Sequence, residues 1–123
     1  MAKQKKPKKA AEAPKKMSDS MYYMMLSLTT PQHGYGVMKH VEELTKGETK
    51  IGPGTLYTNL TKMEENGWIV QRDDIEVEDE RRVPYSLTEA GIVVFQHELE
   101  RRALQVEQGK LALAEGEKHA QER

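Results

Sequence analysis

The clearest hydrophobic pattern lies in residues 51–70, IGPGTLYTNLTKMEENGWIV. One set of apolar residues recurs at the spacing of a single helical face: Leu56, Leu60 and Met63. Pro53 suits the first position of a helix, and Gly67 suits the left-handed residue that ends one. The stretch therefore predicts a short helix with a narrow buried stripe, followed by a strand that begins at Trp68.

Two further helices are predicted before this one. Ser18 or Asp19 can cap a first apolar helix that runs to Leu28, before a Thr-Thr-Pro stop. His33 opens a second helix, which ends at Lys46-Gly47. Its apolar stripe consists of Val37, Met38, Val41 and Leu44. The second and third helices form a plausible helix-turn-helix.

Residues 68–74 and 82–87 read as two strands joined by a loop of about seven residues. Three helices followed by a strand, a loop and a strand is the order of a winged helix, in which the hairpin loop is the wing. The predicted fold class is mainly α (α+β): a winged helix-turn-helix with three helices, a two-stranded wing and a long C-terminal dimerisation helix.

That last helix is predicted over residues 89–119, with Thr88 as its cap. A seam of apolar residues repeats every seven positions: Ile92, Leu99, Val106 and Leu113. We expect a homodimer through this seam, and fraying beyond about residue 110 because Gly109 and Gly116 interrupt it. The alternative is a helix packed on its own domain.

The length of 123 residues fits one domain with tails. We divide it into a disordered lysine-rich tail (1–17), a winged-helix domain (18–88) and the C-terminal helix (89–119). There is no cysteine, no apolar run long enough for a membrane span and no apolar leader, so we expect a cytoplasmic protein without membrane contact.

Charge is unevenly distributed. Residues 1–16 carry about +6, and the rest of the chain about −7. The tail either engages phosphates non-specifically or only aids solubility. The wing is acidic, with Asp73, Asp74, Glu76, Glu78, Asp79 and Glu80.

No pattern indicates catalysis, a cofactor or a metal. The histidines at 33, 40, 97 and 119 lack the spacing of metal ligands, and there is no nucleophile elbow or phosphate-binding glycine loop. We expect His33 to cap local backbone and Trp68 to belong to the core. The protein is therefore not expected to be an enzyme.

The polar face of the third helix suits a DNA groove, because it carries short donors and acceptors with one aromatic ring and one cation. Its members are Thr55, Tyr57, Thr58, Asn59, Thr61 and Lys62. We expect Thr58 and Asn59 to reach bases, and Thr55 and Tyr57 to position the helix on the backbone.

Several motifs together resemble the PadR-like transcriptional regulators over roughly residues 20–100. They are HGY at 33–35, PGTLY at 53–57, MEENGWI at 63–69, Arg81-Arg82, and YSLTEAG at 85–91. The resemblance implies that Thr55, Tyr57, Thr58 and Lys62 face DNA, and that Arg81 and Arg82 contact the backbone from the wing. It further implies the shorter subfamily with a single C-terminal helix.

We therefore expect a dimeric repressor that binds double-stranded DNA at a pseudo-palindromic operator. The resemblance implies release by a small aromatic or cationic effector, for which the candidate pocket is lined by Tyr22, Met25, Phe95 and Leu99. The acidic wing leaves three alternatives: only Arg81 and Arg82 reach DNA, binding is weak, or the lysine tail compensates. Two other functions stay open: a protein-interaction module without specific DNA binding, and a ligand sensor that binds DNA only through its tail.

Overall fold

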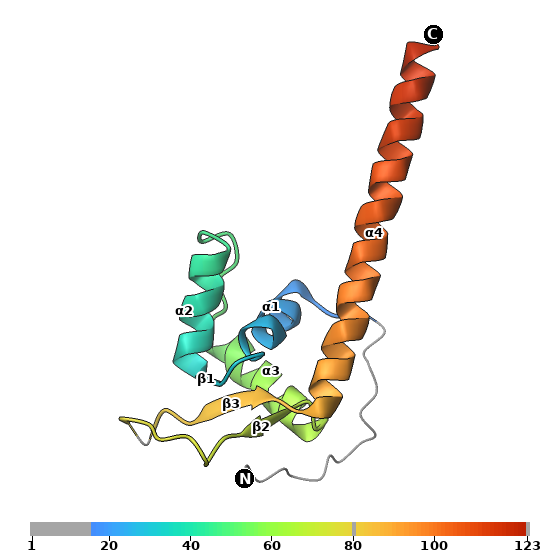
Figure 1. Cartoon of the computed structure of the whole chain (residues 1–123). Helices are drawn as coiled ribbons and strands as arrows, with labels where there is room; N and C mark the ends of the chain where they lie inside the picture. Colours follow the sequence, from blue (N-terminus) through green and yellow to red (C-terminus); the bar gives the residue numbers. More distant parts are fainter. Residues whose placement is uncertain (1–15, 80, 123) are drawn as a thin grey trace.

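The computed structural model describes residues 16–79 and 81–122. The elements follow in the order α1 (Asp19–Ser27), β1 (Gln32–His33), α2 (Gly34–Leu44), α3 (Pro53–Glu65), β2 (Ile69–Gln71), β3 (Pro84–Leu87) and α4 (Glu89–Gln121). The first three helices and the sheet form one body, from which α4 projects as a long rod (Figure 1). The predicted mainly α winged helix-turn-helix fold with a long C-terminal helix is confirmed. Residues 1–15 of the predicted tail, which was assigned to residues 1–17, lie outside the described residues.

Side-chain caps fix the starts of three helices. The Ser18 hydroxyl accepts a hydrogen bond from the Met21 N–H (3.1 Å), and the Thr88 hydroxyl accepts one from the Gly91 N–H (3.1 Å). His33 Nδ1 accepts the Gly36 N–H (3.0 Å) at the start of α2, as the sequence predicted. Because each cap satisfies an N–H that the helix leaves unpaired, these boundaries are set locally.

The sheet has three antiparallel strands in the order β1-β3-β2, rather than the two that the sequence predicted. Strand β1 pairs Gln32 with Tyr85, and two residues after a proline give no alternating pattern to read. The predicted strands are also shortened, to Ile69–Gln71 and Pro84–Leu87. The connecting hairpin loop, which we call the wing, therefore spans residues 72–83.

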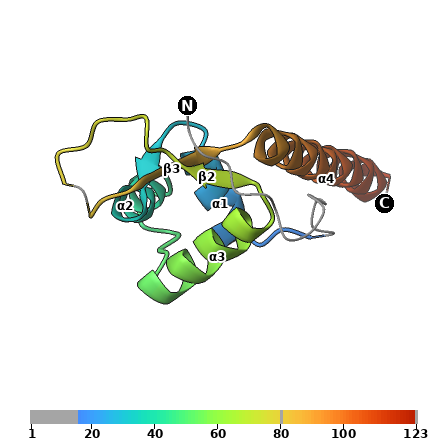
Figure 2. The same cartoon turned by 90° about the horizontal axis from the view of Figure 1, so that it is seen from below.

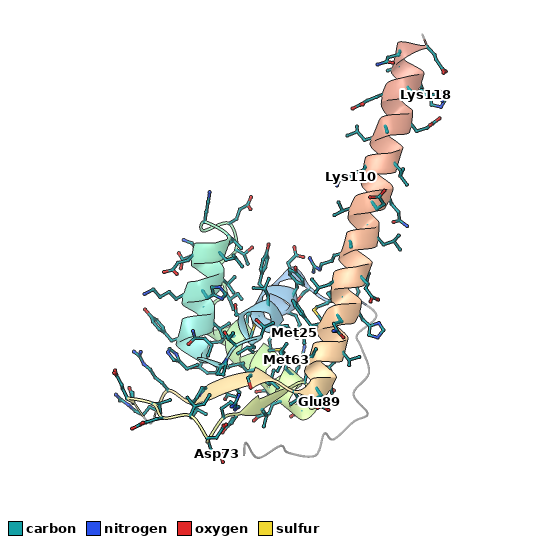
Figure 3. The ribbon with its side chains drawn as sticks, viewed as in Figure 1. Met25, Met63, Asp73, Glu89, Lys110 and Lys118 are labelled. Carbon is teal, nitrogen blue, oxygen red and sulfur yellow. The ribbon has the colours of Figure 1, made fainter. Side chains whose placement is uncertain are left out.

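The core is built largely from methionine and aliphatic side chains. Its fully buried members are Met24, Met25, Leu28, Val37, Val41, Leu56 and Met63. Figure 3 shows Met25 and Met63 inside the body. Trp68 is also buried, as expected. Met17, which the prediction assigned to the tail, is only 4% exposed, so the folded domain begins before residue 18.

Two arginines and a buried carboxylate hold the start of α4 against α1. Glu98, 4% exposed, accepts hydrogen bonds from Arg101 Nη2 (2.6 Å) and Arg102 Nε (2.6 Å). Arg102 also pairs with Asp19 (3.0 Å) and lies 4.1 Å above the centre of the Tyr22 ring. The ion cluster therefore fixes where α4 leaves the domain.

Beyond this cluster α4 is exposed. It continues through Gly109 and Gly116 to Gln121, so the predicted fraying near residue 110 is not seen. Good helix formers around the two glycines offset their cost of ~1 kcal/mol each. The predicted seam, Ile92, Leu99, Val106 and Leu113, is between 42% and 64% exposed. Figure 3 marks Lys110 and Lys118 on this projecting part.

Among the described residues, none of the helices combines the length and the apolar character that crossing a bilayer requires.

Candidate nucleic-acid interface

Helix α3 presents a polar face to solvent because its apolar side packs into the core. Leu56, Leu60 and Met63 are buried, which leaves Thr55, Tyr57, Thr58, Thr61 and Lys62 exposed. Tyr57 is 62% exposed although it is aromatic. The Thr61 hydroxyl donates to the Tyr57 carbonyl (2.9 Å), so it is partly satisfied within the helix. This face carries donors and acceptors of the kind that bind bases and phosphates.

Asn59 does not belong to that face. It is 9% exposed, and its Nδ2 lies 3.5 Å from Met24 Sδ of α1. Asn59 follows Leu56 by three residues and precedes Met63 by four, which places it beside the buried stripe. The expectation that Asn59 reaches bases is therefore wrong for this fold, and we remove it from the candidate interface.

The base of the wing meets α3 and the start of α2 at a small cleft of about 170 Å³. Tyr57, Arg81 and Arg82 line it, so residues predicted from separate motifs lie together here. The side chains of Arg81 and Arg82 are 90% and 56% exposed. Two arginine side chains and a tyrosine that line one cleft supply donors of the kind that bind a phosphate.

Tyr35 also lines this cleft, and the sequence reasoning assigned it no role. Its ring is 59% exposed, is stacked on His33 (6.4 Å between centres) and lies 5.6 Å below the Arg82 guanidinium. The motif at residues 33–35 was noted as a helix start, but an exposed aromatic residue there also points to contact with a partner. Tyr35 therefore joins the candidate interface and holds Arg82 in place.

Arginines of the wing itself neutralise part of its negative charge. Arg72 Nη2 lies 2.6 Å from Asp74 Oδ2, and this hydrogen bond lowers the pKa of Asp74 to about 2. Asp79 is paired with Arg81 (3.2 Å) and Arg82 (3.9 Å). The wing therefore presents fewer unpaired negative charges than its sequence indicates.

The candidate interface lies apart from α4. In both views the wing projects from the side of the body opposite α4 (Figures 1 and 2). Seen from below, α3 and the wing are both open to view, and α4 covers neither (Figure 2). The projecting part of α4 therefore leaves α3 and the wing uncovered.

Of the four residues predicted to line an effector pocket, two are in direct contact. The Tyr22 and Phe95 rings are stacked at 5.6 Å, and Met25 is fully buried in the core. Leu99 is 42% exposed on α4.

A separate hollow of about 330 Å³ lies between the start of α1 and α3, lined by Met17, Asn59, Lys62 and Trp68 among others. Within the described residues, no group of three or more metal-ligating side chains comes together.

Three helices, a small antiparallel sheet with a wing, and a polar third helix define a winged helix-turn-helix protein. The sequence pattern of the PadR-like family of transcriptional regulators matches residues 24–97, well over half of the chain. The chain therefore belongs to this family, which is one of transcriptional regulators rather than enzymes. The resemblance inferred from the sequence is confirmed.

Solved structures share this fold. A transcriptional regulator from Clostridium thermocellum is 25% identical, with a TM-score of 0.60 over 71% of this chain and 84% of that one. A PadR-like transcription factor from Bacteroides fragilis is 21% identical (TM-score 0.54; 76% and 87% covered). PadR from Bacillus subtilis, solved in complex with operator DNA, is 20% identical (TM-score 0.54; 65% and 46% covered). No curated protein matches the chain.

Proposed function

We propose that this protein is a homodimeric, sequence-specific DNA-binding repressor. The observation that carries the proposal is the convergence of the exposed face of α3 with the cleft at the wing, where Tyr57, Arg81 and Arg82 come together. The fold is shared with a relative solved on its operator, which agrees with this use of the surface.

In the proposed complex α3 enters the major groove. Thr58 reaches base edges, and Thr55 and Tyr57 position the helix on the backbone. Lys62, Arg81 and Arg82 neutralise phosphates. Protein-to-phosphate contacts of this kind set affinity, whereas base contacts set sequence preference.

The dimer is proposed to form through the exposed seam of α4. A monomer leaves Leu99, Val106 and Leu113 in water, and burying apolar surface of this kind drives association. Two α3 helices would then lie in successive major grooves about one helical turn apart, so the operator should be an inverted repeat.

The first test is selection of bound duplexes from a randomised pool by the full-length protein. We expect an inverted repeat whose half-sites are about ten base pairs apart. Thr58→Ala should then relax the preference at one position of each half-site, while Lys62→Gln should weaken all sequences alike and reduce the salt slope by about one per protomer. A selection that returns no motif would instead favour the interaction module.

The sign of regulation and its release by a small molecule are also proposals. Because Tyr22 and Phe95 are packed against each other, an effector at that place would have to part the α1–α4 contact. The hollow between α1 and α3 offers a second location, next to Lys62. A flat aromatic or cationic compound that acts as effector should lower the anisotropy of labelled operator bound to the protein. It should leave free operator unchanged.

A further inference from the structure

The two wing arginines that line the cleft, Arg81 and Arg82, are already engaged by one carboxylate. The backbone N–H of Arg81 donates to Asp79 Oδ1 (3.0 Å), and its side chain donates through Nε to the same oxygen (3.2 Å) and through Nη2 to Oδ2 (3.4 Å). The Arg82 N–H donates to the Asp79 carbonyl (2.9 Å), and its Nε lies 3.9 Å from Asp79 Oδ2. Asp79 thus contacts both arginines of this turn through its backbone or its side chain.

Asp79 performs two separable tasks in this arrangement. Its carbonyl and one carboxylate oxygen accept backbone N–H groups, and so they shape the turn from which Arg81 and Arg82 project. Its negative charge faces both guanidinium groups. The hydrogen bond from Arg81 holds the pKa of Asp79 below its usual value, so the charge is present at neutral pH.

A carboxylate and a phosphate offer a guanidinium the same kind of oxygen acceptors. Exposed ion pairs contribute little net stability, so Arg81, whose side chain is 90% exposed, can exchange Asp79 for another anion at small cost. The Arg82 guanidinium also lies 5.6 Å from the centre of the Tyr35 ring, in the cleft that Tyr57 also lines. A phosphate in that cleft would therefore compete directly with Asp79.

We propose that Asp79 is an internal competitor for the DNA backbone: it positions Arg81 and Arg82 for phosphate contact and also reduces the affinity and salt dependence of that contact. This inference rests on the proposed function. It explains how a wing rich in acidic residues still presents cations, and it makes Asp79 a residue that adjusts the strength of their phosphate contacts.

The other paired aspartate of the wing differs. Asp74 pairs with Arg72, whose Nη1 also donates to Ser86 of β3 (3.2 Å). Neither Arg72 nor Asp74 lines the cleft with Tyr57. That pair fastens the wing to the sheet and does not compete with DNA. Removing it should therefore reduce the stability of the wing.

The test compares Asp79→Asn with wild type by fluorescence anisotropy on a selected duplex and on a scrambled one, across salt. Asparagine keeps one oxygen that can accept the Arg81 N–H, and it replaces the second oxygen, which faces the guanidinium groups, with an uncharged amide NH2. We expect binding to tighten ~3- to 10-fold per wing at low salt. The salt slope should steepen by about one per wing. Asp79→Ala, which also removes the turn acceptor, should gain less.

Two controls separate competition from general repulsion. Glu76→Gln makes the same charge change at an exposed wing residue and should alter affinity by less than ~2-fold. Asp79→Asn should also have no effect when Arg81 and Arg82 are both replaced by alanine. An equal gain from Glu76→Gln, or a gain that persists without the arginines, would overturn the proposal.

The two duplexes distinguish this proposal from the proposed function. Backbone contacts carry no sequence information, so the Asp79→Asn gain should appear on both duplexes. A gain on both without preference for the selected one would support Asp79 as competitor and count against the specific repressor. Preference for the selected duplex without any gain from Asp79→Asn would support the specific repressor and count against Asp79 as competitor.

Discussion

At the scale of single residues, burial decides which polar side chains on α3 are available to a ligand. Asn59 and Thr58 are neighbours in the sequence, yet Asn59 is 9% exposed beside Met24 and Thr58 is open to solvent. Asn59 was assigned to the polar face from the sequence, although its spacing of three from Leu56 and four from Met63 puts it beside the buried stripe. Only the position of α1, which is 35 residues away in the chain, determines that it is covered.

Replacing Asn59 tests this assignment. Asn59→Ala should lower the free energy of unfolding by about 1 kcal/mol, because it removes a buried amide and its packing. The relative affinities for different duplexes should stay within ~2-fold of wild type. Chemical denaturation and competition binding measure the two effects. A relaxed base preference with unchanged stability would return Asn59 to the interface.

Glu98 links stability to pH. Hydrogen bonds from Arg101 lower the pKa of Glu98 in the folded state, against an opposing effect of burial, and Arg102 adds to the lowering. A lowered folded pKa means that this stabilisation is present above the unfolded value of ~4.3 and is lost as the pH falls through the folded value.

Glu98→Gln should therefore destabilise the protein by ~1–3 kcal/mol at pH 7. The difference from wild type should shrink as the pH falls through the lowered folded pKa of Glu98, where the carboxylate becomes neutral. Urea denaturation at pH 7 and at an acidic pH below that pKa measures it, with the exposed Glu100→Gln as control. A difference that is equal at both pH values would show that charge on Glu98 does not contribute.

At the scale of elements, boundaries with local causes were predictable. The caps at Ser18, His33 and Thr88 act within three residues, and Gly67 has the positive φ of 76° that a left-handed helix end requires. Strand β1 was missed because its two residues are fixed only by pairing with β3, more than fifty residues further on. The role of Tyr35 in the cleft was missed because Arg82, which lies over its ring, is also far from it in the sequence.

The junction between β3 and α4 depends on close backbone approach. The Thr88 N–H donates to the Trp68 carbonyl (2.9 Å), and a side-chain carbon at Gly91 would overlap that same oxygen. Backbone atoms cannot move aside as a flexible side chain would. Gly91 is therefore required for the packing of α4, not for flexibility.

Gly91→Ala should lower the free energy of unfolding by ~1–3 kcal/mol or more through overpacking. Gln96→Ala, an exposed change five residues further along α4, should alter it by less than ~0.5 kcal/mol. Thermal or chemical denaturation measures both. Equal stability of the two variants would mean that the start of α4 shifts freely away from Trp68.

At the scale of the whole molecule, α4 carries more exposed apolar surface than the domain itself requires. Only its first turns, with Val94, Phe95 and Glu98, are buried against the body. The remainder projects away from the wing and α3 (Figure 1). The proposed dimer would cover this surface and leave both DNA-facing surfaces open.

Two matched substitutions test which face of α4 forms the dimer. Val106→Glu lies in the seam, whereas Leu111→Glu lies two residues short of the seam residue Leu113, about 200° around the helix. Both side chains are exposed, at 57% and 63%. Sedimentation should show that Val106→Glu shifts the protein toward monomer and that Leu111→Glu does not, with helicity retained in both. Equal effects would contradict the seam assignment.

Any measurement of DNA affinity has to separate the contribution of α3 from that of the lysine-rich tail, residues 1–15 of which lie outside the described residues. Lysine contacts with phosphates carry no sequence preference, and binding of that kind falls steeply with salt. Met17 is buried and its carbonyl accepts a hydrogen bond from Arg102 Nη2 (3.4 Å), so a truncation should remove residues 1–15 and no more. That variant retains the folded domain and its whole candidate interface.

The decisive measurement is fluorescence anisotropy of the full chain and of the variant without residues 1–15. Each is titrated against DNA from upstream of its own gene and a scrambled duplex, across salt. We predict that the shortened protein still prefers the upstream DNA by ~10-fold or more, since base contacts carry specificity. Loss of both preference and binding with the tail would contradict it.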